Sequence, residues 1–342
     1  MHAPTSHTPA SHDPLPPDEP WRDAWEEVAP AIWAIDSGYV RARMDAIHLL
    51  VSPEGRAALI DTGTTHSLPQ TLACLAALGI APDAVDWICL THVHLDHAGG
   101  AGAMARELPN ARVAVHPRGA RHVVDPAKLW DGTVAVYGAA RSEALYGGLV
   151  PLPAERVLSV GEGDRIAFGS RELRVMDTPG HARHHVCYHD ATAAAVFTGD
   201  TFGLCYREMR RADGASNVFV TTTPVHFDPA ALHESVARIA ALAPEAVYPT
   251  HYSRATDVAR LAADLHRQID AHVAACEGLD PTAADAHAEL SRRLEAQVLA
   301  ESRRNAWAAQ DEEALALMAG DIDLNAQGLL VWMQSWTRST PR

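Results

Sequence analysis

Histidine and aspartate gather in one short stretch of the chain, LTHVHLDHAGG at residues 90–100. Within six positions it contains His92, His94, Asp96 and His97. Because His92 and His94 are two positions apart, both side chains point to one side of an extended segment. Asp96 and His97 follow in a turn that can direct their side chains to a second ion. Imidazole and carboxylate together suit zinc, iron or manganese rather than calcium or magnesium.

Three more side chains of the same kinds stand where other strands are expected to end. His181 lies in DTPGHARHH, Asp200 in FTGDT and His251 in YPTHY. A histidine-rich surface loop would explain the first cluster alone, but it does not explain these. Seven ligands exceed what one tetrahedral ion uses, and they suit two ions that share one carboxylate.

The surrounding pattern predicts the elements that position these side chains. Short apolar runs at 32–36, 46–52 and 57–63 indicate antiparallel strands. A helix is expected over 67–79, ending at a glycine. The buried run 85–91 then delivers the cluster at a strand's carboxyl end, a usual place for chemistry in mixed α/β folds. Later elements are a strand at 111–117, a hairpin series at 156–180, strands at 184–190, 193–201 and 246–252, and a helix at 229–244.

Composition divides the chain into three parts. Residues 1–20 are rich in proline, serine and histidine and predict a disordered or draped tail. Residues 21–255 form the expected catalytic domain. Residues 256–342 predict an α-helical extension. Its apolar stretch from Leu329 to Trp336 either packs over the catalytic domain and walls the site, or forms a homodimer interface. Residues 118–150 are expected to form a helical lid.

Charge and cysteine content limit the partners. The net charge is −15, from 28 basic and 43 acidic residues, which argues against nucleic acid or an anionic membrane. No apolar run of about 18 residues and no secretory leader is visible. The five cysteines are dispersed without a C-x-x-C pair, as in a reducing compartment. These features predict a cytoplasmic protein that acts on a small molecule.

The motif H-x-H-x-D-H in THVHLDHAGG, preceded by IDTG and followed by TPGH, TGD and a late TH, resembles the metallo-β-lactamase-fold superfamily, especially its glyoxalase II-like branch. The resemblance covers residues 30–255. It implies an α/β fold, a four-layer αββα sandwich with the metals at one edge. In it, one metal is held by His92, His94 and His181, the other by Asp96, His97 and His251, and Asp200 bridges them.

The resemblance implies a dinuclear, metal-dependent hydrolase of the acyl ester or thioester class. Two divalent ions, zinc first and iron or manganese as alternatives, would ionise a bridging water near neutral pH. The substrate would be a small thioester, lactone or ester. Asp96 is the catalytic candidate, because it could both bind a metal and orient the nucleophile. The alternative is a non-haem iron oxidoreductase of the same fold, resembling persulfide dioxygenases, which use a single iron.

Residues near the ligands are candidates for support or substrate contact. The IDTG aspartate is a scaffold carboxylate of the family, a second histidine follows the TPGH ligand, and a phenol near the metals could act as an oxyanion donor. The candidates are Asp61, His185, Tyr206, Arg207 and Tyr252, with Tyr137 and Tyr146 in the expected lid. The C-terminal helices lack the basic pattern with which glyoxalase II grips glutathione.

Overall fold

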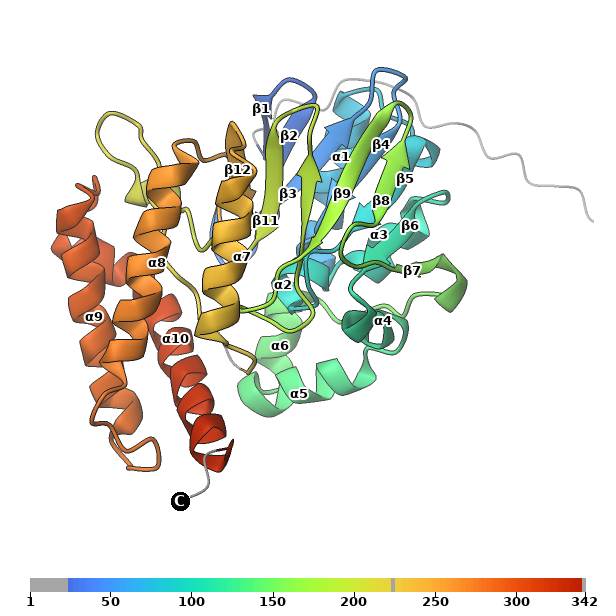
Figure 1. The fold of residues 1–342 in the computed structure, drawn as a ribbon. Coiled ribbons are helices and arrows are strands. Elements are labelled where there is room, and N and C mark those ends of the chain that lie inside the picture. Colours follow the sequence, from blue (N-terminus) through green and yellow to red (C-terminus); the bar gives the residue numbers. More distant parts are fainter. Residues whose placement is uncertain (1–23, 223–224, 340–342) are drawn as a thin grey trace, which may run out of the picture.

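Two β-sheets packed face to face form the centre of the molecule, and helices cover both outer faces (Figure 1). The computed structural model describes residues 24–222 and 225–339. The predicted tail at 1–20 lies outside the described residues. The predicted four-layer αββα arrangement is confirmed.

The first sheet has seven strands in the order β1 to β7. Strands β1 to β4 pair antiparallel, as the sequence predicts for β2 to β4, and β4 to β7 pair parallel. Strand β1 was not predicted from the sequence. Because parallel strands end at the same edge, the loops after β4 and β5 lie side by side. The strands are β1 Trp25–Ala29, β2 Ile32–Asp36, β3 Ala46–Val51, β4 Ala57–Ile60, β5 Val85–Cys89, β6 Arg112–Val115 and β7 Val157–Ser159.

The second sheet has five strands in the order β12-β11-β10-β9-β8. Its strands are β8 Arg165–Phe168, β9 Arg171–Asp177, β10 Val186–Asp190, β11 Ala195–Gly199 and β12 Ala246–Pro249. Strands β8 and β9 form the expected hairpin. Strand β7, predicted in the same hairpin series, instead pairs with β6 in the first sheet. The hydrophobic pattern indicated a strand there but could not specify its partner.

Apolar side chains from both sheets fill the space between them. Leu50 and Ala58 of the first sheet pack with Tyr188 and Phe197 of the second, and none of the four exposes surface. A second cluster joins the first sheet to α1 and α3, through residues such as Leu59, Leu75 and Met104. The two sheets are therefore fixed relative to each other, which holds their loop edges together.

The helices lie at both outer faces and at the C-terminal end. Helix α7 begins where predicted, because the Asp228 side chain accepts a hydrogen bond from the backbone N–H of Ala231 and Pro229 occupies the first turn. The α-helices are α1 Leu68–Ala77, α2 Leu95–Ala98, α3 Ala101–Glu107, α4 Pro117–Val124, α5 Ala127–Tyr137, α6 Ala139–Tyr146, α7 Pro229–Ala241, α8 Val258–Ala275, α9 Ala286–Arg304 and α10 Asp311–Ser339. Single 3₁₀ turns occupy Thr65–Ser67, Pro82–Ala84, Ala154–Arg156 and Arg207–Met209.

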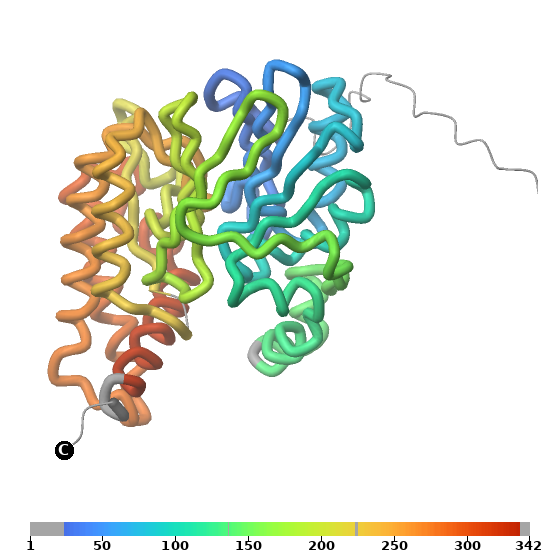
Figure 2. The backbone as a smooth tube through the Cα atoms, turned by 45° about the vertical axis from the view of Figure 1, so that its right-hand side comes forward, coloured from blue at the N-terminus to red at the C-terminus, as the bar shows by residue number. Residues whose placement is uncertain are grey.

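The C-terminal helices α8, α9 and α10 stack beside the second sheet (Figures 1 and 2). One face of α10 is buried at helical spacing, through Ala314, Met318, Ile322, Ala326, Leu329 and Met333. These residues belong to the same apolar cluster as Val196 of β11 and Val236 of α7. The apolar stretch that begins at Leu329 thus packs within its own chain through Leu329 and Met333. Whether it walls the site or also forms a homodimer interface stays a prediction. The Trp336 side chain lies outside the described residues.

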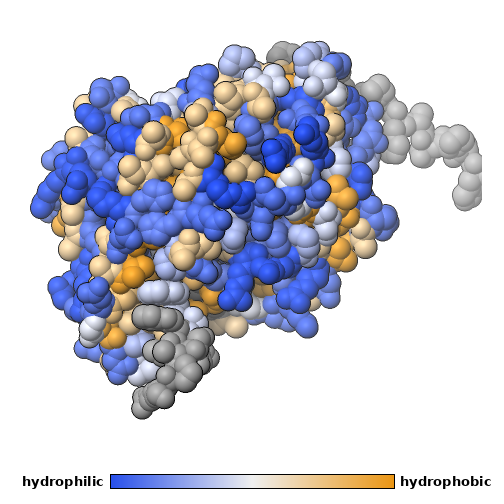
Figure 3. Space-filling model, viewed as in Figure 1, coloured by the Kyte–Doolittle hydropathy of each residue, from blue (hydrophilic) through white to orange (hydrophobic). Residues whose placement is uncertain are grey.

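Helix α10 is also the one helix in the described part of the chain that is long and apolar enough to cross a membrane. The segment Asp311–Ser335 has a mean hydropathy of 1.2. One of its faces packs against α8 and α9, and 39% of its apolar window is buried. On the face of the molecule in Figure 3, apolar patches are small and separated by hydrophilic residues.

Candidate metal centre

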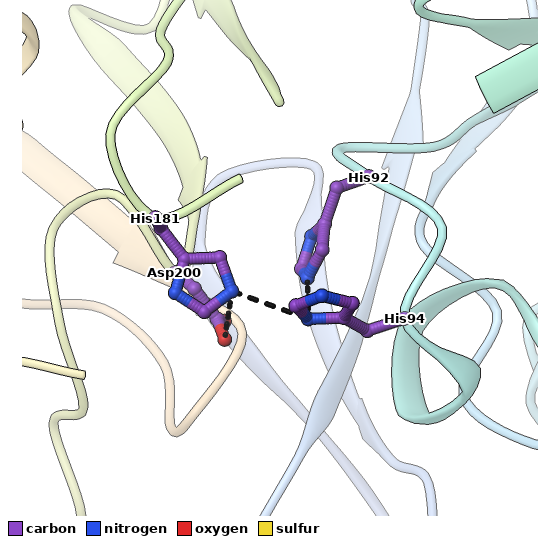
Figure 4. Close-up of side chains that lie close together, drawn as sticks. All are labelled: His92, His94, His181 and Asp200. Atoms are coloured by element: carbon purple, nitrogen blue, oxygen red, sulfur yellow. Dashed lines mark hydrogen bonds and ion pairs between the residues drawn. The ribbon is translucent and has the colours of Figure 1, made fainter. Parts of the chain in front are cut away.

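The first group of ligand atoms lies where the β5 loop meets the loops after β9 and β11 (Figure 4). His92 Nε2 is 2.9 Å from His94 Nδ1, and His181 Nε2 is 3.2 Å from the same atom. The Oδ2 atom of Asp200 lies 3.5 Å from His181 Nε2. Ligand atoms about 2.0–2.2 Å from a tetrahedral zinc ion lie roughly 3.3 Å from one another, so these four atoms match the outline of one ion.

The second group adjoins the first. His97 Nε2 is 3.2 Å and His251 Nε2 is 3.5 Å from Asp200 Oδ1. Asp96 Oδ2 lies 3.7 Å from His97 Nε2 and 3.6 Å from His251 Nε2. The two carboxylate oxygens of Asp200 therefore face different groups. The structure brings all seven predicted ligands together.

The electrostatics of the donor groups differ between the two ligand groups. In the second group, neighbouring carboxylates outweigh burial and raise the pKa values of His97 and His251, so these rings would release a proton when a metal binds. Burial and the neighbouring imidazoles hold the pKa values of His92 and His94 well below the usual range, so both rings are neutral. Burial by itself raises the pKa of Asp200, but His97, His251 and His181 outweigh it and keep the carboxylate ionised. His97 Nε2 and Asp200 Oδ1 are buried without a hydrogen-bond partner. Buried polar atoms without partners are costly, and metal ions would satisfy them here.

Asp61, predicted as a scaffold carboxylate, joins two loops that bear ligands, the loop after β5 and the loop after β12. It follows β4 and accepts hydrogen bonds from the backbone N–H of Thr91 at 2.7 Å and from the Thr250 hydroxyl at 2.9 Å. It also accepts the Nδ1 proton of His97 at 2.9 Å. That contact fixes the tautomer of His97 and leaves Nε2 free for a metal, the usual task of a carboxylate behind a ligating histidine.

Asp45 performs the same task for His251, and sequence reasoning missed it. Its Oδ1 lies 2.6 Å from His251 Nδ1, and both side chains are buried. Burial raises the pKa of Asp45 to about 6, against the lowering effect of His251. The available signal was its place directly before β3. Because β3 runs antiparallel to β4, the start of β3 lies at the edge where β4 ends.

His185 supports the loop that delivers Asp200. Its Nδ1 lies 3.0 Å from the hydroxyls of both Thr178 and Thr201, and its Nε2 accepts the backbone N–H of Asp200 at 3.2 Å. Gly199 turns the chain before Asp200 with φ +48°, and a Cβ there would lie 2.6 Å from His185 Nε2. The turn thus needs both the glycine and the histidine ring against it.

Three of the substrate candidates have partners that direct them elsewhere. Arg207 forms an ion pair with Glu26 and lies 4.7 Å over the ring of Tyr252. Tyr252 is buried between the first sheet and its loops. Tyr206 lies edge-on to His251, with ring centroids 6.1 Å apart, but its hydroxyl donates to Asp321 of α10 at 3.3 Å. Among these candidates, only Tyr206 borders the ligands.

A pair of phenols from two other elements interacts electrostatically with Asp96 of the second ligand group. The hydroxyls of Tyr39, in the loop between β2 and β3, and Tyr146, in α6, lie 3.0 Å apart. Burial and then the charge of Asp96 raise the pKa values of both tyrosines. The same two causes raise the pKa of Tyr137 in α5. Tyr146 and Tyr137 come from the expected lid; Tyr39 was missed, because nothing in the sequence links its loop to α6.

An αββα sandwich with histidines and aspartates converging at one loop edge defines a class of proteins built to bind metal ions. Residues 47–251 match the family model of the metallo-beta-lactamase superfamily, and the chain belongs to this superfamily. Membership supports a metal-dependent hydrolase in the broad sense.

Curated proteins of similar sequence match part of this chain. A hydroxyacylglutathione hydrolase from Fuscovulum blasticum is 31% identical over 191 residues, which are 56% of this chain and 55% of that protein. One from Stenotrophomonas maltophilia is 30% identical over 155 residues, 45% of each chain. The chain thus spans about half the length of these relatives.

Solved structures show the same fold. The superfamily protein TTHA1429 from Thermus thermophilus aligns with a TM-score of 0.60 at 23% identity, covering 86% of this chain and 95% of that one. The archaeal superfamily protein ST1585 from Sulfolobus tokodaii aligns with a TM-score of 0.59 at 22% identity, covering 87% and 98%. Both coverages extend well beyond the region that the family model matches.

Proposed function

We propose that this protein is a dinuclear metal-dependent hydrolase that cleaves a small thioester, lactone or ester. The observation that supports this best is the orientation of Asp200, whose two carboxylate oxygens face two separate ligand groups at 3.2–3.5 Å. A carboxylate shared in this way is typical of paired-ion sites. When bound, two ions would supply an ionised water as nucleophile and a Lewis acid for the substrate carbonyl.

The chain's own residues would hold and complete this chemistry. His92, His94 and His181 would bind one ion, and Asp96, His97 and His251 the other. Asp96 is the candidate for orienting the nucleophile, because its side chain keeps 21% of its surface exposed whereas that of Asp200 keeps 5%. Burial and the charge of Asp96 raise the pKa values of Tyr39 and Tyr146, and their hydroxyls could donate to a substrate carbonyl.

The ester and thioester class is supported by the hydroxyacylglutathione hydrolases among the relatives. Zinc is the expected metal, with iron or manganese as alternatives, because histidine and carboxylate accept all three. A cytoplasmic location agrees with five free and buried cysteines. An iron oxidoreductase with one ion would need only one of the two groups, so the complete second group favours the hydrolase.

Metal analysis combined with turnover tests the proposal. We expect the full chain, purified without added metal, to hold close to two transition-metal ions and to hydrolyse at least one member of a panel of thioesters, lactones and esters. A chelator should abolish turnover and zinc should restore it. The variant His94→Ala should lose metal, and the control His189→Ala on β10 should keep it. Full turnover by metal-free protein, or oxygen consumption with a persulfide by protein holding one iron, would overturn the proposal.

Asp96 needs a separate test. We expect Asp96→Asn to lower turnover more than it lowers metal content, because asparagine can still bind a metal through its carbonyl oxygen but cannot accept a proton. An Asp96→Asn protein with full metal content and full turnover would rule out the orienting role.

A further inference from the structure

A buried asparagine interrupts the apolar face that α10 packs against the rest of the chain. Asn325 is 1% exposed and lies between Ile322 and Leu329 of that face. Because a buried amide is costly unless its hydrogen-bonding groups have partners, the partners indicate what the residue contributes. Asn325 also lies outside residues 47–251, the region that the family model matches.

The side chain of Asn325 clamps the backbone on both sides of Thr221. Its Oδ1 accepts the backbone N–H of Thr222 at 2.7 Å, and its Nδ2 donates to the backbone carbonyl of Val220 at 3.1 Å. The hydroxyl of Thr222 in turn donates to the backbone carbonyl of Asn325 at 3.1 Å. Thr221 and Thr222 are both buried. Helix α10 therefore fixes the two peptide groups that flank Thr221.

The backbone of Thr221 contacts a metal ligand. Burial lowers the pKa of His181, whereas Asp200 and a hydrogen bond with the Thr221 backbone act to raise it. A hydrogen bond that favours the protonated ring is one in which the ring donates, so the carbonyl of Thr221 is the acceptor. The Nε2 atom of His181 lies 3.2 Å from His94 Nδ1 and 3.5 Å from Asp200 Oδ2, which leaves Nδ1 as the donor.

One peptide group joins the clamp to the ligand. The N–H of Thr222 and the carbonyl of Thr221 belong to the same planar, trans peptide group and point in opposite directions. Asn325 holds the N–H of that group, and His181 bonds to its carbonyl. The contact with α10 therefore orients the acceptor of the imidazole proton.

We propose that Asn325 is a positioning residue for the first ligand group, because through the Thr221 peptide it fixes the tautomer and the orientation of His181 with Nε2 toward the metal. A carbonyl or carboxylate behind a ligating histidine has this task in many metal sites, as Asp61 has for His97 here. The inference rests on the metal centre of the proposed function. It gives the C-terminal extension a part in holding the metal.

A second buried amide on the same segment provides a comparison. Gln268 of α8 accepts the N–H of Val220 at 2.8 Å and donates to the carbonyl of Val218 at 2.9 Å. It therefore clamps the peptide groups that flank Phe219, whose own backbone pairs with Leu204 rather than with a ligand. Loss of this clamp should disturb the same segment without releasing His181.

Competition with a chromophoric chelator tests the inference on the zinc-loaded full chain. The ion that is lost in His94→Ala identifies the first ligand group. Asn325→Leu keeps the size of the side chain and removes both of its hydrogen bonds, and we expect it to weaken the first ion by about 10–100-fold and the second ion by less than about threefold. Gln268→Met and Leu329→Ala destabilise the same region and are the matched controls. Both should leave the affinity ratio of the two ions unchanged.

The imidazole proton of His181 provides a readout besides affinity. In zinc-loaded protein with ¹⁵N-labelled histidine, we expect a slowly exchanging Nδ1–H signal that is absent from His181→Gln. The signal should disappear or exchange faster in Asn325→Leu and persist in Leu329→Ala. If Asn325→Leu does not fold, the milder Asn325→Ser takes its place, with changes in the same direction.

An unchanged affinity ratio in the Asn325 variant would overturn the inference, and so would an equal change of the ratio in Gln268→Met or Leu329→Ala. A His181 signal that the Asn325 variant leaves unaltered would also overturn it. Turnover is scored separately. A protein that holds two ions but cleaves no ester defeats the hydrolase proposal alone, whereas normal turnover with an unchanged ratio in the variant defeats the Asn325 inference alone.

Discussion

The two sides of the metal centre are built in different ways. The ligand side consists of strand ends whose side chains are buried and held from behind, as Asp61 holds His97 and Asp45 holds His251. The other side is assembled from separate elements: Tyr39 in a loop, Tyr146 in α6 and Tyr206 in the loop after β11. A rigid metal-binding edge is thus combined with surroundings that can change independently, which is how one fold serves many substrates.

The largest expected effect belongs to the ligand side. Replacing Asp200 by asparagine removes the charge that faces both ligand groups. We expect turnover to fall by roughly a hundredfold to a thousandfold, because bound metal ions stabilise the charge of the transition state by several kcal/mol. Metal content should drop below two ions per chain, measured by elemental analysis.

The control for this change is Asp213→Asn, an exposed aspartate far along the loop after β11. It should keep both metal and turnover. An Asp200→Asn protein that retained two ions and normal turnover would remove the basis for a shared carboxylate.

The next largest effect is on stability and concerns the packing of α10 against α8 and α9. Leu329 exposes no surface and belongs to the cluster that joins α10 to α8 and α9. Leu329→Ala should lower the free energy of unfolding by about 2–5 kcal/mol, measured by urea denaturation, with metal content unchanged. The exposed Leu242→Ala should cost less than about 0.5 kcal/mol. A Leu329→Ala protein of unaltered stability but halved mass in solution would show that this face forms a dimer interface instead.

Away from the metal centre, a buried histidine in α8 makes the free energy of unfolding depend on pH. His272 in α8 is fully buried, donates through Nδ1 to the Gln268 carbonyl, and has a pKa lowered to about 4 by burial. Between pH 6.5 and 4 the unfolded chain binds more protons at this position than the folded chain does. Stability therefore falls as pH falls through this window, by about 3 kcal/mol from this group alone.

Thermal and urea unfolding of chelator-treated protein would measure this dependence, and His272→Leu should flatten it. The control His66→Gln, at an exposed position, should retain the wild-type slope. Equal slopes in wild-type and His272→Leu proteins would show that the buried ring does not control acid stability.

The smallest expected effect lies behind the second ligand group. Asp45→Asn should weaken metal binding there by about 10–100-fold, because His251 loses the carboxylate that fixes its tautomer. Competition with a chromophoric chelator should show one weakened ion and one unaffected ion. Asp86→Asn, whose partner is Arg56 at the opposite end of the sheet, is the control. Equal weakening of both ions would mean that Asp45 supports the whole edge rather than His251.

The difference between the two sides of the metal centre also explains which residues could be predicted from the sequence. All seven ligands follow predicted strands within short motifs, so their types and spacing identified them directly. Asp45 was not predicted because it precedes its strand, β3. It reaches the site only because β3 pairs antiparallel with β4. Tyr39 and Tyr146 lie in a loop and in α6, and only tertiary packing brings their hydroxyls together. Tyr206 was placed near the ligands, but the direction of its hydroxyl depends on a helix more than a hundred residues away.

An anomalous-scattering crystal structure of the zinc-loaded protein would test the central claim most directly. We expect two peaks about 3.5–4 Å apart, one among His92, His94 and His181 and the other among Asp96, His97 and His251, with Asp200 between them. A single peak, or peaks away from these side chains, would contradict the account.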